Sequence, residues 1–222
     1  MPMAVPRLPL HWPAYGVVAA ASLGMVATAM LISDERRLDR AAKLYAVQSL
    51  LLAIVFATLG LTVDVYMLAW AASALVTKTI LVPYLLLRLV RTSKSLEERS
   101  LAGAGVTWAS TAAATALGFT LGYMLGGRLL GVELGVAVTL FLVGLIQIIV
   151  RSSMVKQLLG LCHFENSSHL TLALLAPGLP ETIEIGLATD AILLVFFGTL
   201  VALRVYRLTG SLDSTLLRRL RG

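Results

Sequence analysis

The chain has 222 residues, of which 58% are hydrophobic and 14% charged, and its mean hydropathy is +0.88. These values lie far from those of soluble domains and indicate a multi-pass membrane protein. Its apolar residues are mainly Leu, Ala, Val and Ile, which favours an all-α helical bundle over an outer-membrane barrel. The net charge of +6 does not indicate a nucleic-acid partner, because the basic residues lie beside hydrophobic segments and act there as topology signals.

Seven hydrophobic segments are long enough to cross a bilayer. They cover residues 13–33, 44–63, 66–90, 101–125, 134–150, 155–176 and 182–206. We therefore predict an irregular segment at 1–12, helices 1–4 within 13–125, helices 5–7 within 134–206 and a basic cytoplasmic tail at 207–222. The fourth segment is rich in Gly, Ala, Ser and Thr, a composition that lets membrane helices approach closely.

The basic residues predict the orientation of these helices. If the loop at 34–43 is cytoplasmic, 15 of the 18 Lys and Arg residues fall on the cytoplasmic side. Only Arg7 and Arg128 then fall outside, and Lys78 lies within a span. Because cytoplasmic loops keep Lys and Arg, we predict an outer N-terminus and an inner C-terminus.

A weak internal similarity suggests two parallel three-helix repeats, made of helices 1–3 and 5–7. Aligning Arg37 with Arg151 sets Gln48 opposite Cys162. Lys78 and Asp190 then fall at comparable depths in the third and seventh helices. The alternative is that any two hydrophobic helices look alike, and the low identity leaves both interpretations open.

Charged residues inside the predicted spans are the main functional signal. Glu165 lies in the sixth span, Asp190 in the seventh and Lys78 in the third. A charged side chain at the centre of a membrane helix costs roughly 2.5–3.5 kcal/mol and commonly marks an ion or proton path. We therefore predict a proton pathway that contains Asp190, Glu165, Lys78 and His169.

Spacing and depth suggest how these residues could pair. Glu165 and His169 are four residues apart and so share one face of a helix, near Cys162. Histidine changes its charge close to neutral pH in water, so this face could pass protons; it could equally hold two helices together by a static hydrogen bond. Lys78 could pair with Asp190 or with Glu165, and either pair could be functional or structural.

The remaining polar positions have more ordinary explanations. Glu184 lies near the outer end of the seventh span, where an acidic residue suits a helix N-terminus after Pro180. We predict that His163 points away from Glu165 and is structural. Pro83 removes a backbone donor and is expected to disturb the third helix just past Lys78.

Helices 5–7 resemble subunit K of bacterial complex I and the equivalent small subunit of cation/proton antiporters. The resemblance rests on Arg151, on Gly160, Leu161 and Asn166, and on the acidic residue within LATDA at 187–191. Over residues 36–222 the sequence is similar to the hydrogenase-4 component E family of formate-hydrogenlyase-type [NiFe] hydrogenases. The segments YAVQS, WAASALVTKTILVP, ENSSHL and EIGLATDAI carry this more specific similarity.

This resemblance implies which residues couple redox chemistry to proton movement. In subunit K two intramembrane glutamates have that role; the second corresponds to Asp190 and the first to Cys162. Glu165 lies three residues after Cys162 and could replace the missing glutamate.

The resemblance also implies that nickel-iron and iron–sulfur centres lie on soluble partner subunits and that antiporter-like subunits are membrane partners. It places the chain in the inner (cytoplasmic) membrane of a prokaryotic cell. This chain is expected to hold no cofactor. Its single cysteine, Cys162, excludes an internal disulfide and a cysteine-ligated cluster.

Three functional hypotheses follow. The first is a non-catalytic membrane subunit of a proton-translocating hydrogenase, and the second is a subunit of a cation/proton antiporter. The third is a purely structural membrane anchor. No nucleophile–base pair or nucleotide-binding loop in the sequence indicates independent catalysis.

Overall fold

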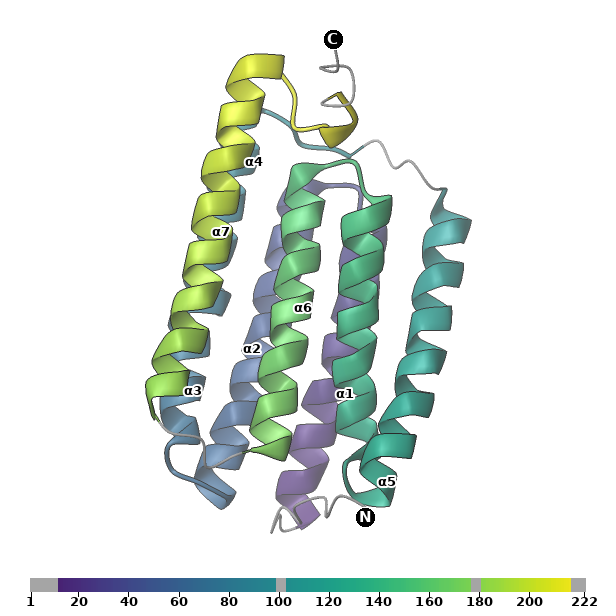
Figure 1. The fold of residues 1–222 in the computed structure, drawn as a ribbon, viewed down its shortest axis with the longest axis vertical. Helices are drawn as coiled ribbons and strands as arrows, with labels where there is room; N and C mark the ends of the chain where they lie inside the picture. The colour runs from purple at the N-terminus through teal and green to yellow at the C-terminus, as the bar shows by residue number, and fades with distance from the viewer. Residues whose placement is uncertain (1–11, 99–102, 177–180, 217–222) are drawn as a thin grey trace.

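The structure is a computed structural model that describes residues 12–98, 103–176 and 181–216, except the side chains of 12, 128, 129, 181–188 and 191. The described residues form an all-helical bundle, as predicted (Figure 1). Its elements are α1 (Trp12–Asp34), α2 (Leu38–Thr62), α3 (Met67–Ala74), the π-helix η1 (Leu75–Leu81), α4 (Val82–Ser93), α5 (Ala104–Val150), α6 (Met154–Leu175) and α7 (Glu181–Thr209). Of the predicted segment 1–12 the structure describes only residue 12, and of the predicted tail 207–222 it describes residues 207–216.

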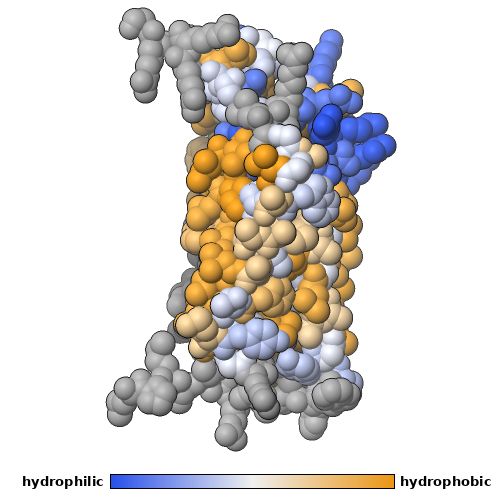
Figure 2. Space-filling view, turned by 90° about the vertical axis from the view of Figure 1, so that its right-hand side faces the viewer, coloured by the Kyte–Doolittle hydropathy of each residue, from blue (hydrophilic) through white to orange (hydrophobic). Residues whose placement is uncertain are grey.

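Five described helices are long and apolar enough to cross a membrane. They are Pro13–Asp34, Leu38–Thr62, Met67–Ser93, Leu130–Val150 and Ile192–Thr209. The first half of α5 and the whole of α6 do not meet this criterion, although both run alongside the others in the bundle (Figure 1). Figure 2 shows an apolar surface between the two ends, with hydrophilic residues gathered at the end where α7 stops.

The third span is one continuous helix whose middle turn is π-helical. The backbone N–H of Val82 donates to the carbonyl of Thr77, five residues earlier, and Pro83 follows directly in the first turn of α4. Because Pro83 has no N–H to donate, the regular ladder cannot pass through this position. The predicted disturbance next to Lys78 is therefore a wide helical turn that contains Lys78 itself.

The predicted fourth and fifth helices are the two halves of α5, folded back at Gly127. Gly127 has φ 59° and ψ −146°, a conformation that requires glycine. The halves are in close contact, since a Cβ on Gly122 would lie 2.2 Å from the backbone nitrogen of Gly135. The small residues of the fourth span thus pack against a neighbouring helix, as their composition predicts.

The bundle consists of two layers with the same helix order. The first unit (residues 12–98) contains α1, α2 and the α3–η1–α4 helix, and the second unit (residues 128–214) contains the second half of α5, α6 and α7. In Figure 1 the second unit lies in front of the first, with α7 against α4 and α6 against α2, and α1 packs on α5. The first half of α5 connects the two units.

Backbone pairing gives the register between the units. Arg37 forms an isolated bridge with Glu97, and Ser153 forms one with Asp213; each residue of the second bridge lies 116 positions after its counterpart. The flanking hydrogen bonds follow the same shift, because Leu38 donates to the carbonyl of Leu96 as Met154 does to that of Leu212. Helix ends also agree, at Asp34 and Val150 and at Ser93 and Thr209.

The structure therefore supports two parallel three-helix repeats but corrects their register. The predicted alignment of Arg37 with Arg151 is wrong by two residues, since Ser153 is the counterpart of Arg37. The predicted start of the second helix at residue 44 is also late, because α2 begins at Leu38. Residues 211–214, predicted as part of a simple tail, pair with the α5–α6 connection.

Candidate functional site

The site is centred on Lys78, which η1 places inside the bundle with only 2% of its surface exposed. Its Nζ lies 3.1 Å from Oε1 of Glu165 on α6. The same nitrogen lies 3.0 Å from Oδ1 of Asn166 and 3.0 Å from Nδ1 of His169. One ammonium therefore has three partners, all on two successive turns of α6, and the predicted residues Lys78, Glu165 and His169 do come together.

Glu165 is held more loosely than this ion pair suggests. Neither carboxylate oxygen makes a well-oriented hydrogen bond within the described part of the chain, and the contact with Lys78 is electrostatic. The side chain keeps 13% of its surface exposed, although both carboxylate oxygens are buried. A carboxylate in this position can reorient without breaking a fixed hydrogen bond.

His169 has two possible partners at a single ring nitrogen. Nδ1 lies 2.8 Å from the backbone carbonyl of Glu165 and 3.0 Å from Nζ of Lys78. With a proton on Nδ1 the ring donates to the carbonyl; without one, Nδ1 accepts from the ammonium. These two bonds exclude each other, so the hydrogen bonding of Lys78 depends on where His169 carries its proton.

A chain of amides extends this site across the bundle. Nδ2 of Asn166 donates to Oε1 of Gln48 over 3.4 Å, and Nε2 of Gln48 donates to the carbonyl of Met25 over 3.0 Å. Nδ1 of His163 lies 2.9 Å from the same Gln48 oxygen. Gln48 thus joins the polar network as a secondary position. His163 contacts the far end of this network, away from Glu165, in agreement with its predicted direction.

Cys162 is a buried free thiol one residue before His163. The side chain of Glu184 lies outside the described residues, so its predicted capping role stays a prediction.

Asp190 does not pair with Lys78. With the 116-residue shift between the units, the position equivalent to Lys78 is Leu194 and not Asp190. Asp190 lies four residues before Leu194, which is about one turn or roughly 6 Å along the helix. Asp190 is exposed on α7 and lines a groove of about 800 Å³ between α6 and α7, together with Glu165 and His169. Of the two partners predicted for Lys78, Glu165 is the one at ion-pair distance.

A second buried ion pair was missed by the sequence analysis. Nη1 of Arg151 lies 3.3 Å from Oε2 of Glu98, and both side chains are buried. Arg151 also donates to the carbonyl of Ser33 and to Oγ1 of Thr107, while Lys156 donates to the carbonyl of Ile32. These cations cap the C-terminal end of α1, where helix carbonyls favour positive charge.

The prediction counted Arg151 and Lys156 among the basic residues of short cytoplasmic loops, but both side chains are buried within the bundle. The sequence carried one signal for the burial of Lys156. This residue lies in the first turn of the predicted span 155–176, on the helix face that also carries Gly160 and His163.

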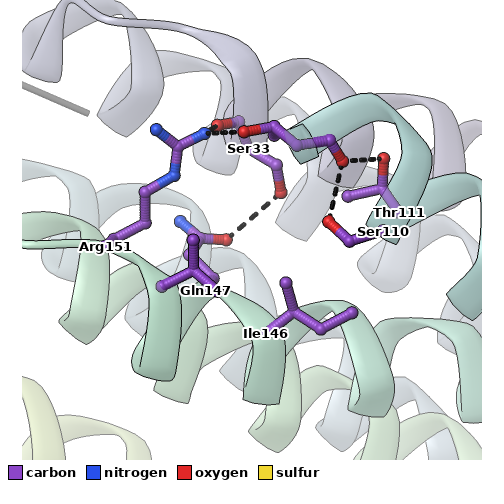
Figure 3. Close-up of a pocket in the computed structure, with 8 residues that line it drawn as sticks. Ser33, Ser110, Thr111, Ile146, Gln147 and Arg151 are labelled. Carbon is purple, nitrogen blue, oxygen red and sulfur yellow. Dashed lines mark hydrogen bonds between the residues drawn. The ribbon is translucent and has the colours of Figure 1, made fainter. Parts of the chain in front are cut away.

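A small polar cavity lies beside Arg151. It has a volume of about 10 Å³ and is lined by Ser33, Gln147, Ser110 and Thr111 from three helical segments (Figure 3). Oγ of Ser33 lies 3.5 Å from Oε1 of Gln147. The cavity is about as large as one water molecule requires.

Glu133 is a further acidic residue within the bundle that the sequence analysis placed in a loop. It lies in the second half of α5 with 1% of its surface exposed. Neither carboxylate oxygen has a hydrogen-bond partner within the described residues. The Gly127 turn brings this residue into the bundle, and its position in a connection had no signal that distinguished it from a solvated charge.

The fold and this site define a class: a helical membrane protein with ionisable side chains buried at mid-bundle and no sign of a nucleotide or substrate site in its sequence motifs. The comparisons with known proteins agree with that class. Residues 133–222 match the family described as NADH-ubiquinone/plastoquinone oxidoreductase chain 4L, which covers most of the second unit.

Full-length relatives give the particular family. The chain is 36% identical over 203 residues to hydrogenase-4 component E of Escherichia coli K12, covering 89% of this chain and 94% of the relative. The proteins of the same name from Escherichia coli O157:H7 and Shigella flexneri give the same values. The chain belongs to the hydrogenase-4 component E family, and the predicted resemblance is confirmed. No solved structure matches it.

Proposed function

We propose that this chain is a non-catalytic membrane subunit of a complex-I-like, proton-translocating [NiFe] hydrogenase, in which Lys78, Glu165 and His169 carry charge across the bundle. The observation that carries the proposal is the position of Lys78 Nζ within 3.1 Å of Glu165 and within 3.0 Å of His169. Family membership favours this function over the cation/proton antiporter alternative.

The proposed step is an exchange of partners. A proton that reaches Glu165 from the α6–α7 groove removes its negative charge and weakens the attraction to Lys78. Lys78 then keeps Asn166 and the unprotonated His169 as hydrogen-bond acceptors, so its charge stays solvated by protein. When that proton passes on to Nδ1 of His169, which lies 3.9 Å from Oε1 of Glu165, the carboxylate regains its charge and the ion pair with Lys78 re-forms. The net result is a proton moved from the groove to His169.

In this function the chain crosses the membrane seven times, with its N-terminus outside and its C-terminus in the cytoplasm. The 15 basic residues on one side support this topology. Antiporter-like subunits are its proposed membrane partners. The nickel-iron and iron–sulfur centres belong to soluble subunits of the complex, bound at the cytoplasmic face of a prokaryotic inner membrane.

The test uses the intact complex, isolated from cells that produce this chain. Glu165→Gln keeps the shape of the side chain and removes its titration. We expect hydrogenase turnover with a soluble dye to continue while proton uptake or release by vesicles falls at least tenfold. Ser168→Ala, on the same helix and facing the same groove, is the matched control. If Glu165→Gln pumps normally in a complex of normal yield, the chain acts as a structural anchor instead.

A further inference from the structure

The groove between α6 and α7 corresponds to the face of the first unit that is already occupied. Three residues of the first unit contact the second unit there: Tyr45 lies against His163, Gln48 binds His163 and Asn166, and Lys78 binds Glu165. Moving these three positions by 116 residues gives Leu161, Phe164 and Leu194. All three line the groove.

The second unit therefore packs on one face of the first unit, and the equivalent face of the second unit is left uncovered by the described residues. Because α1, α2 and α4 each pack on a helix of the second unit, the second unit covers one whole side of the first (Figure 1). The same side of the second unit faces no described segment. In an 18-residue apolar stretch of α7 only 17% of the residues are buried, against 44% in the stretch of the same length in the Met67–Ser93 helix.

Charge argues against lipid as the occupant of this open face. Asp190 and Glu165 both line the groove, and no Lys or Arg is among the described residues that line it. Lys78 compensates Glu165 from the other side of α6, whereas Asp190 has no ion pair within the described chain. Carboxylates in membrane helices face protein or water rather than acyl chains, because lipid cannot solvate them.

We propose that this groove docks a transmembrane helix of another membrane subunit, and that this helix places a Lys, Arg or His side chain opposite Asp190. The helix occupies the position that α6 holds on the first unit. Its apolar side chains cover Phe164, Leu193 and Phe197, which are exposed in this chain. The proposal rests on the proposed function, because it requires a complex with further membrane subunits.

Site-directed photo-crosslinking in the intact complex tests this proposal. p-Benzoylphenylalanine replaces Phe197 in one variant and Leu193 in another. The control variant carries it in place of Leu117, which is also exposed but lies on the first half of α5. We expect positions 193 and 197 to form a covalent adduct with a different membrane subunit. Mass spectrometry should map it to one transmembrane helix with a basic residue within two turns.

Three results would overturn the docking proposal: adducts only with lipid, adducts only with a second copy of this chain, or no protein adduct at either groove position. A crosslinked partner helix without Lys, Arg or His would contradict the proposed basic side chain opposite Asp190. These failures differ from failure of the proposed function. The latter is indicated when no nickel-containing subunit copurifies with the unmodified chain, or when Glu165→Gln leaves pumping unchanged.

Discussion

Lys94 and Gly210 occupy equivalent positions in the two units and share a left-handed backbone conformation, with φ of 51° and 71°. Each follows the last residue of a third helix, Ser93 or Thr209, and each precedes a Ser-Leu pair followed by an acidic residue. The same local sequence therefore ends the helix and directs the chain back toward the connection after the unit's first helix. Within the described residues Lys94 is the non-glycine residue that carries this conformation.

Replacing Lys94 by glycine should stabilise the protein. A left-handed conformation costs a residue with a Cβ roughly 1–2 kcal/mol, and glycine avoids most of this cost. We expect Lys94→Gly to raise the thermal midpoint in mild detergent and Gly210→Ala to lower it. Gly103→Ala is the control, because Gly103 has negative φ and open space around its Cα. Equal midpoints for all three variants would show that neither turn limits stability.

Gly122→Ala should disrupt the hairpin within α5. A Cβ at this position would lie 2.2 Å from the backbone of Gly135, and backbone atoms cannot move aside as a flexible side chain can. We expect a loss of at least 2 kcal/mol, at the upper range of overpacking effects, seen as a lower melting temperature and a lower yield. Gly105→Ala lies in the same helix with nothing within 4 Å and should be neutral. A well-folded Gly122→Ala variant with wild-type stability would contradict the close contact.

Lys78 and Glu165 should show strong thermodynamic coupling. Removing one member of a buried ion pair leaves the other charge without compensation and costs about 3–5 kcal/mol. We therefore expect Lys78→Met and Glu165→Leu each to reduce the yield of assembled complex. The double variant should recover most of that yield, because no uncompensated charge remains.

Proton translocation separates a structural pair from a functional one in this experiment. The double variant should assemble but should not pump, since the titratable groups are gone. Recovery of both assembly and pumping would assign the pair a structural role. Additive losses of yield in the double variant would show that the two side chains do not interact.

The helical architecture was predictable because hydrophobic length alone specifies membrane helices, and the chain alternates long apolar segments with short basic ones. The pairing of Lys78 with Glu165 was one of two alternatives, and sequence could not choose between them. That choice depends on the relative rotation and depth of α6 and α7, which are fixed by packing against other helices.

The register of the repeat was missed for a related reason. Apolar helices can be aligned at several offsets with similar scores, and the alignment from Arg37 used residues that differ between the units. The matching residues lie at the other end, where Arg88 and Arg91 correspond to Arg204 and Arg207. The burial of Glu98, Arg151 and Glu133 could not be predicted, because a charged residue in a connection looks the same whether the connection is solvated or folded onto the bundle.

Asp190→Asn should separate coupling from folding. Lys78 pairs with Glu165, so the loss of the Asp190 charge strands no cation within the described chain, and the fold should be retained. Asp190 shares its groove with Glu165, and we propose that it delivers protons to that site. Pumping per assembled complex should therefore fall sharply while dye-linked hydrogenase turnover continues, and loss of the proposed pair with the partner helix should also lower the yield of complex.

Asp190→Glu keeps a titratable carboxyl at a slightly longer reach and should retain part of the pumping. Complex yield and proton translocation must be measured on the same preparations, because an early loss of assembly would indicate that Asp190 mainly holds a partner helix. A normal yield combined with undiminished pumping in the Asn variant would remove Asp190 from the pathway. The route to Glu165 would then have to start from His169, the other titratable side chain that lines the groove.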